Sequence, residues 1–153
     1  MEVLDIQEII HKDLLVVDSK ATTKGQILKE LADLLERKGY VASSEIFLTD
    51  VYQRESEGTT GIGQGIAIPH GKSTTVNQTV ILIATLAQPI PWETLDDQDV
   101  KVVLLFAVKA EDANLKHLRL LQKIATLLAD NEFIHELKEV DTVEALYQLM
   151  INQ

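Results

Sequence analysis

A histidine, a proline and three glycines lie close together near the middle of this sequence, with a spacing that could support group-transfer chemistry. The glycines, at alternate positions, are Gly61, Gly63 and Gly65. Glycine at such positions allows positive φ and lets backbone N–H groups approach a ligand closely. The apolar run that follows, residues 66–68, is long enough for a short buried strand, and Pro69 lacks an N–H donor, so we expect strand pairing to stop there. His70 is therefore predicted at the tip of a strand, with a glycine directly after it.

An imidazole in that setting could take part in several kinds of chemistry. Acyl transfer would need a serine or cysteine nucleophile, and the sequence has no cysteine and no serine in a G-x-S-x-G turn. A zinc site would need about three protein ligands, and His70 with His117 leaves the third missing. The remaining option is that His70 is itself a nucleophile and carries a phosphoryl group. Because phosphoryl oxygens are negatively charged, the candidate stabilising groups are Arg54, His117 and the N–H groups of the glycine segment.

Three known motifs are approached by this sequence but not matched, two because of glycine spacing or position and one because of a residue type. One segment resembles the P-loop pattern G-x-x-x-x-G-K-[ST], but five residues instead of four separate Gly65 from Gly71. The alternating glycines also differ from G-x-G-x-x-G, and they precede the short strand instead of following it. The metalloprotease pattern H-E-x-x-H begins at His135 but has Glu139 in place of its second histidine. We therefore interpret His135 and His11 as structural or solvated residues.

Composition narrows the class of protein. The length of 153 residues suits a single domain over residues 1–153. No cysteine is present, so disulfides and thiolate metal sites are excluded, and we expect neither a metal nor a cofactor. The formal net charge of −10 argues against a nucleic-acid partner and is compatible with a basic protein partner. Because no apolar run has the length of a membrane span and no signal peptide is apparent, we expect a cytoplasmic protein without membrane insertion.

The elements that must position these groups alternate between apolar runs and amphipathic stretches. Continuous apolar runs predict buried strands at residues 14–17, 80–86 and 100–108. The first long helix is expected to begin with a capping box of Thr23 and Gln26 and to be closed by Gly39. Residues 5–12 are expected to form one or two further helical turns.

The remaining helices carry apolar stripes. The second helix, capped by Ser43 or Ser44 and ending near Arg54, should turn inward Ile46, Phe47, Leu48, Val51 and Tyr52. The helix after Asp112 should have one stripe of Leu115, Leu118, Leu121, Ile124, Ala125 and Leu128, with His117 at its edge. Two more helices are expected at residues 132–140 and 142–150. This order predicts an α/β fold, a three-layer α/β/α sandwich with a mixed central sheet flanked by helices on both faces.

The residues around His70 resemble the phosphohistidine signature of enzyme IIA of the fructose–mannitol class, a component of the bacterial phosphoenolpyruvate-dependent sugar phosphotransferase system. The matching pattern is Glu55, six residues, Ile62-Gly63, two residues, then Ile66-Ala67-Ile68-Pro69-His70-Gly71. Every position fits, and the resemblance extends over the whole chain. Arg54 lies sixteen residues before His70 and matches the arginine of the family, and His117 matches its second histidine.

The resemblance implies a mechanism and a set of partners. His70 would accept a phosphoryl group, on Nε2, from the phosphohistidine of the carrier protein HPr. It would pass the group to a cysteine of the cognate enzyme IIB, which phosphorylates the sugar that crosses the membrane component IIC. Arg54 and His117 would stabilise the phosphoryl oxygens. Because the chain has no cysteine and no apolar span, we do not expect a fused IIB or IIC and predict a free-standing IIA. We also expect the face around His70 to be apolar and to serve for docking.

Two alternatives remain at this point. The nitrogen-type IIA branch carries phosphate for regulation and has nearly the same motif, whereas residues 90–93 and the pair Thr59-Thr60 favour the sugar branch. A non-phosphorylated regulatory module that binds a small anion at His70 is the second alternative. Fructose is the default sugar for the transport branch, although the sequence does not identify it.

Overall fold

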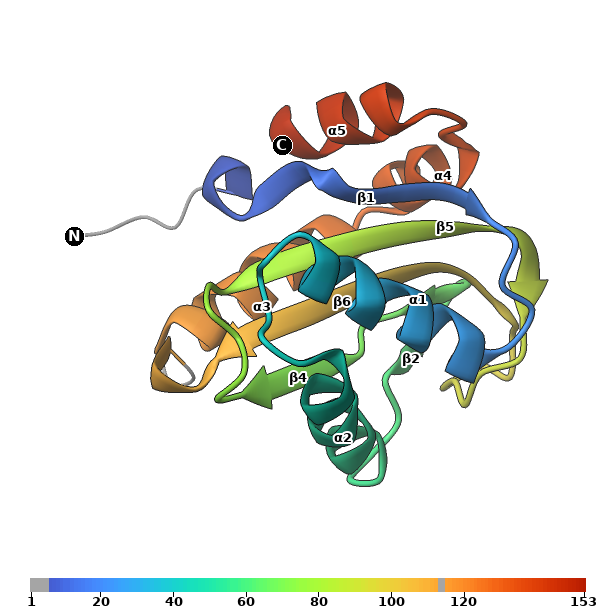
Figure 1. Ribbon diagram of the computed structural model, residues 1–153. Helices are drawn as coiled ribbons and strands as arrows, with labels where there is room; N and C mark the ends of the chain where they lie inside the picture. The colour runs from blue at the N-terminus through green and yellow to red at the C-terminus, as the bar shows by residue number, and fades with distance from the viewer. Residues whose placement is uncertain (1–5, 113–114) are drawn as a thin grey trace.

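A mixed β-sheet lies between two layers of helices (Figure 1). The computed structural model describes residues 6–112 and 115–153. Within these ranges the sheet has six strands: β1 (Ile10–Ser19), β2 (Gly61–Gly63), β3 (Ile66–Ala67), β4 (His70–Ser73), β5 (Val80–Ile90) and β6 (Val100–Lys109). The helices are α1 (Lys24–Arg37), α2 (Ser44–Glu55), α3 (Leu115–Leu128), α4 (Asn131–Glu139) and α5 (Val143–Ile151), with short 3-10 helices at Ile6–Glu8 and Ala110–Asp112.

The strand order is β1-β5-β6-β3-β2, and β4 also pairs with β6. β5 and β6 are antiparallel and form the centre of the sheet. β1 runs parallel to β5, while β3 and β4 run parallel to β6. Parallel and antiparallel pairs therefore occur in one sheet, which confirms the predicted mixed sheet.

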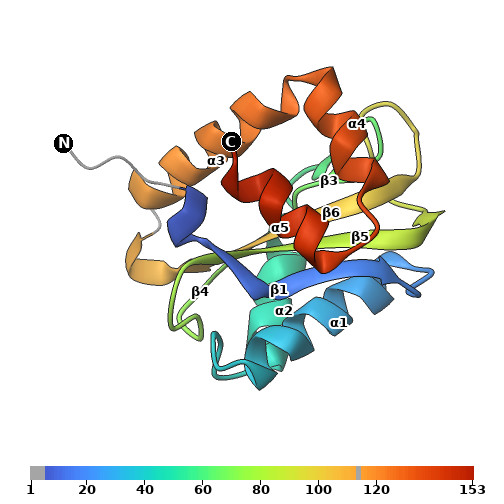
Figure 2. The same ribbon diagram turned by 90° about the horizontal axis from the view of Figure 1, so that it is seen from above.

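Helices cover both faces of the sheet, with α1 and α2 on one side and α3, α4 and α5 on the other (Figure 2). Successive side chains of β5 show why both faces need cover. Leu82 and Ala84 pack with the residues of α1 and α2, whereas Ile81 and Ile83 pack with those of α3, α4 and α5. All four are fully buried. Because a strand points alternate side chains to opposite faces, a continuous apolar run requires a layer on each face, and the three-layer α/β/α sandwich is confirmed.

The ends of α1 follow the sequence signals closely. The Thr23 hydroxyl accepts a hydrogen bond from the backbone N–H of Gln26 at 3.1 Å, as expected for an N-cap. The Gln26 side chain accepts from the backbone N–H of Thr22, one residue earlier than in the standard capping box. At the other end Gly39 has a φ of 84°, the left-handed conformation that closes a helix. The predicted start and end of this helix are therefore correct.

Three details of the sequence prediction are wrong. Of the predicted helical stretch 5–12, residue 5 lies outside the described part of the chain, only the 3-10 turn Ile6–Glu8 is helical, and β1 already begins at Ile10. In α2, Ile46 and Tyr52 are exposed by 53% and 45%, and Phe47 and Val51 are the buried residues. Leu48 is half-buried and packs against the same core, so three of the five predicted residues face inward and two remain on the surface.

The buried stripe of α3 is also partly shifted from the predicted one. Ile124 and Leu128 are buried and Leu121 packs against the core, as predicted. Leu120 is buried as well, however, while Leu118 is 52% exposed and Ala125 is exposed. The side chains of residues 112–117, including Leu115, lie outside the described part of the chain. Apolar residues on more than one face of this helix made the period ambiguous. None of the helices in the described ranges has the length and apolar character of a membrane span.

Candidate active site

His70 is the first residue of β4 and lies beside β6. Its ring is 5.4 Å from the ring of Phe106, its register partner, and the Phe106 N–H donates to the Pro69 carbonyl at 3.0 Å. β3 pairs with β6 in the same parallel register, with Ile66 opposite Val102. Pairing thus resumes directly after Pro69, because proline lacks a donor but keeps its acceptor. The strand is thus interrupted at residues 68–69 and His70 lies at a strand end, as expected, but it begins β4, so the expectation that pairing does not continue beyond Pro69 is wrong.

Between β3 and β4, the backbone of Ile68 continues the antiparallel pairing of β3 with the chain just before β2. The Ile68 N–H donates to the carbonyl of Thr60 at 2.9 Å. Thr60 belongs to the loop that joins α2 to β2. The backbone two residues before His70 is therefore held by this loop, and the position of the loop affects the position of His70.

Gly71 allows α2 to lie directly on β4. A Cβ atom at this position would lie 2.4 Å from Cε1 of Phe47 and 2.8 Å from Cγ2 of Val51. Contacts this short do not occur between real side chains, so the helix could not approach the strand as closely with any other residue. Gly71 thus fixes the distance between β4 and α2, whose last turn contains Arg54.

The glycine segment forms a tight hairpin between β2 and β3. Its two turn residues, Gln64 and Gly65, have φ values of 57° and 80°, as in a two-residue type I′ turn. The Gln64 N–H donates to the Asp96 carboxylate at 2.9 Å. These glycines therefore serve the turn, and the Gln64 N–H is already occupied in this conformation.

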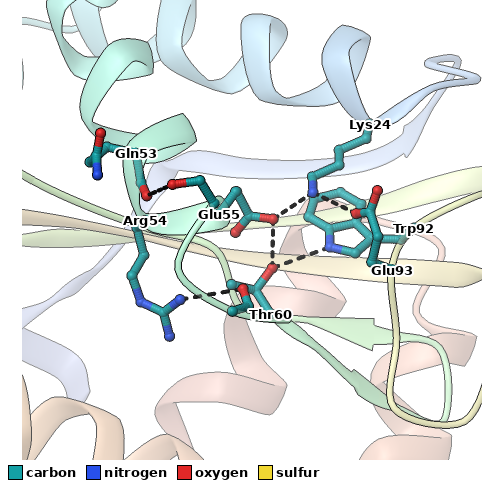
Figure 3. A network of polar contacts seen from close by, with 9 residues as sticks. Lys24, Gln53, Arg54, Glu55, Thr60, Trp92 and Glu93 are labelled. Atoms are coloured by element: carbon teal, nitrogen blue, oxygen red, sulfur yellow. Dashed lines mark hydrogen bonds and ion pairs between the residues drawn. The ribbon is translucent and has the colours of Figure 1, made fainter.

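Arg54 lies in the last turn of α2, as predicted. Its Nη1 donates to the Gly58 carbonyl at 3.4 Å, within the loop that follows the helix (Figure 3). Since an arginine has five N–H donors, this single bond leaves others for a ligand. The guanidinium is thus attached to the same loop that holds the backbone before His70.

A polar network connects this loop to α1 and to the segment after β5 (Figure 3). Oε1 of Glu55 lies 2.6 Å from Nζ of Lys24 and accepts a hydrogen bond of 2.9 Å from the hydroxyl of Thr60. The Thr60 oxygen in turn accepts from Nε1 of Trp92 at 3.2 Å. Lys24 also pairs with Glu93 at 2.7 Å and lies over the Trp92 ring. Glu55 and Thr60 are nearly buried, with exposed fractions of 7% for the side chain and 4% for the residue.

Two pKa values reflect this network. Burial lowers the pKa of Lys24, but its hydrogen bonds to Glu55 and Glu93 outweigh that effect, so the pKa lies above its ordinary value. The hydrogen bond from Lys24 holds the pKa of Glu93 below its usual range. Lys24 is therefore charged at neutral pH and compensates the carboxylates beside it.

The other histidines differ in how far the structure describes them. His117 lies in the first turn of α3, but its side chain is outside the described part of the chain. The ring of His11 lies 5.5 Å from that of Tyr40, and His135 is exposed on α4. Among the described residues, no group of three or more carboxylate or imidazole side chains is arranged to hold a metal ion.

Sequence reasoning did not find the network around Glu55. Glu55 was recognised only as the first position of the motif, and Trp92 only as part of an extended segment. Lys24 and Trp92 lie 31 and 37 residues away from Glu55 along the chain, and no local pattern connects them. The one available signal was the fixed spacing of six residues between Glu55 and Ile62.

The fold and the site together define a narrow class of protein: an α/β sandwich in which a histidine, preceded by proline and followed by glycine, begins a strand of the sheet. The family model "Phosphoenolpyruvate-dependent sugar phosphotransferase system, EIIA 2" matches residues 8–153, and the chain belongs to this family. The expected fructose–mannitol class of enzyme IIA is thereby confirmed.

Curated relatives include both transport and regulatory proteins. The chain is 33% identical over 144 residues to the 2-O-alpha-mannosyl-D-glycerate-specific EIIABC component of Escherichia coli K12, covering 94% of this chain and 22% of that protein. It is also 33% identical over 150 residues to a nitrogen regulatory protein of Bradyrhizobium diazoefficiens, covering 96% and 95%. The chain thus spans less than a quarter of the first relative and nearly all of the second.

Solved structures give the same fold. The nitrogen regulatory protein IIA-Ntr of Neisseria meningitidis superposes with a TM-score of 0.86 at 28% identity, covering 95% of this chain and 98% of that one. The mannitol IIA of Escherichia coli has a TM-score of 0.77 at 22% identity, covering 92% and 98%, and supports the fold alone.

Proposed function

We propose that residues 1–153 act as one cytoplasmic phosphocarrier domain of the sugar phosphotransferase system. His70 accepts a phosphoryl group from the phosphohistidine of HPr, as the N–P bond of the donor breaks and a new one forms at Nε2. The group then passes to a cysteine of an enzyme IIB, which restores free His70. The observation that carries this proposal is the family match together with the position of His70 in the family motif, where the Pro69 carbonyl and Gly71 hold its backbone.

Arg54 and His117 are proposed to stabilise the phosphoryl oxygens during transfer. Support for Arg54 comes from its place at the end of α2, because this helix packs on β4 beside His70. His117 is assigned from the family motif and from its place in the first turn of α3.

IIB as a partner is supported by a related complex. A solved complex of enzyme IIA for mannitol with phosphorylated enzyme IIB from Escherichia coli has the same fold in its IIA chain, with a TM-score of 0.78. HPr as the donor is inferred from family membership. The membrane component IIC would be reached only through IIB.

Fructose uptake is the transport function that we propose. A fructose-like EIIA component of Escherichia coli K12 is 33% identical over 127 residues, covering 83% of this chain and 84% of that protein. Nitrogen-type regulation is the second candidate, and the high similarity to IIA-Ntr favours it. Transfer to a purified sugar-specific IIB would separate the two, because only a transport IIA passes its phosphoryl group to such a protein.

The proposed function can be tested by incubating the chain with phosphoenolpyruvate, enzyme I and HPr and measuring intact mass. Wild type should gain a single acid-labile phosphate, and His70→Ala should gain none. His135→Ala is the matched control, because it removes an exposed histidine from α4 and should behave like wild type. A phosphate on His70→Ala would refute the assignment, and no phosphate on wild type would favour the anion-binding alternative.

A further inference from the structure

Glu55 holds two segments of the active site through a single carboxylate oxygen. Oε1 accepts the hydroxyl of Thr60 and pairs with the ammonium of Lys24. The backbone carbonyl of Thr60 accepts the N–H of Ile68, two residues before His70. One side chain is therefore connected, through Thr60, to the backbone that leads into His70.

The Glu55 carboxylate also holds the loop to which the Arg54 guanidinium is hydrogen-bonded. Arg54 directly precedes Glu55 in the last turn of α2, and its guanidinium donates to the Gly58 carbonyl. Thr60, two residues further, is fixed by Glu55 and by the indole N–H of Trp92. The loop of residues 56–60 is thus closed at one end by Arg54 and at the other by the bond between Glu55 and Thr60 (Figure 3).

Burial of the Glu55 carboxylate destabilises the folded state more than the anchoring of a short loop would require. The Glu55 side chain is only 7% exposed, and its Oε2 atom is buried without a hydrogen-bond partner among the described residues. The ion pair with Lys24 offsets only part of the free energy that is lost when the carboxylate is removed from water. An apolar side chain could anchor a short loop without this desolvation cost. A directional acceptor is useful where a backbone must be placed accurately.

We propose that Glu55 is a positioning residue for phosphoryl transfer, acting through Thr60 on the backbone before His70 and through the loop on Arg54. This inference rests on the proposed role of His70 as the phosphoryl acceptor. Glu55 makes no bond to the phosphoryl group. It orders the groups that do, so its removal should slow the transfer step itself more than it weakens donor binding.

The neighbouring Glu93 supplies a matched control. Both carboxylates pair with Lys24, but the Glu93 side chain is 73% exposed and is not bonded to Thr60. Glu55→Gln and Thr60→Val should lower the maximal rate of transfer from phosphorylated HPr roughly 10- to 100-fold, as expected for misplaced reacting groups. Glu93→Gln should stay within about twofold, and Thr60→Ser, which keeps the hydroxyl, should retain most of the rate.

The NMR signals of the His70 ring distinguish a change in the position of His70 from a general loss of stability. NMR spectra of the imidazole should show shifted His70 ring signals in Glu55→Gln and Thr60→Val, but wild-type signals in Glu93→Gln. Thr60→Val keeps the test valid if Glu55→Gln does not fold. Unchanged ring signals and a normal rate in folded variants, or equal slowing by Glu93→Gln, would overturn the proposal. If wild type accepts no phosphate, the proposed function fails, while the ring signals still decide whether Glu55 positions His70.

Discussion

The centre of the sheet and the segment from Glu55 to His70 lie beside each other but are held in different ways. β5 and β6 are fixed by apolar side chains that are fully buried on both faces of the sheet. The candidate active-site segment, residues 55–71, is fixed by a tight turn, by Gly71 and by polar contacts that involve Glu55 and Thr60. Substitutions in the first region should therefore act on folding, and substitutions in the second on phosphoryl transfer.

The largest expected effect on stability comes from substitution of Phe106, which belongs to the centre of the sheet. Phe106→Ala removes a fully buried ring from β6 and should lower the free energy of unfolding by about 3–5 kcal/mol. His70→Ala, on the strand opposite, should abolish phosphate acceptance while changing stability by less than about 1 kcal/mol, since His70 is only partly buried. Urea unfolding of both variants measures the contrast, and similar losses of stability would remove the distinction between the regions.

A smaller effect, on rate alone, is expected from the groups proposed to stabilise the phosphoryl oxygens. Arg54→Ala should slow transfer roughly 100-fold without abolishing it, because it removes charge stabilisation and leaves the nucleophile intact. His117→Ala should act in the same direction. Rapid-quench measurement of phosphoryl transfer gives these rates.

Arg54→Lys separates the contribution of the positive charge of Arg54 from that of its hydrogen-bonding geometry. It keeps the positive charge but loses the planar set of donors that can bond Gly58 and a phosphoryl group together. Its rate should fall between those of wild type and Arg54→Ala. Unfolding of either Arg54 variant would mean that the residue is structural.

Gly71 lies where the two regions meet, and its substitution should affect both. In Gly71→Ala the added methyl group would meet the Phe47 ring at 2.4 Å, so α2 must shift, at a cost of about 1–3 kcal/mol. Phe47→Leu in the same chain makes room and should recover part of that loss. Chemical denaturation of the single and double variants tests the coupling, and additive losses would show that the two side chains do not compete for this space.

The sequence predicted the central region better than the active-site segment, for a physical reason. Continuous apolar runs and helix caps are local signals, so β5, β6 and both ends of α1 could be read from neighbouring residues. The helical pattern likewise placed Arg54 at the end of α2. The strand pairing after Pro69 could not be read, because it depends on the register with β6.

The partners of Glu55 depend on tertiary structure in the same way. Lys24, Thr60 and Trp92 come from three separate parts of the chain, and the fold alone brings them together. Burial can also be predicted where it does not occur: Ile46 fits the apolar pattern of α2 but is exposed, because an apolar side chain in a helical pattern is not necessarily buried. Side-chain contacts between distant segments therefore mark the limit of prediction from a single sequence.

The smallest effect is expected at Asp96, which supports the turn of Gln64 from outside the core. Backbone hydrogen bonds from Gln64 and Gln98 hold the pKa of Asp96 below its ordinary value of 3.8. A carboxylate with a lowered pKa in the folded state contributes stability above its unfolded pKa and loses it as the pH falls through the folded value. Asp96→Asn should therefore melt at a lower temperature than wild type at pH 7, and the difference should shrink as the pH falls below about 4. Asp97→Asn removes the same charge from the next residue without these bonds, so a similar pH-dependent difference in that variant would attribute the effect to net charge instead of to the turn.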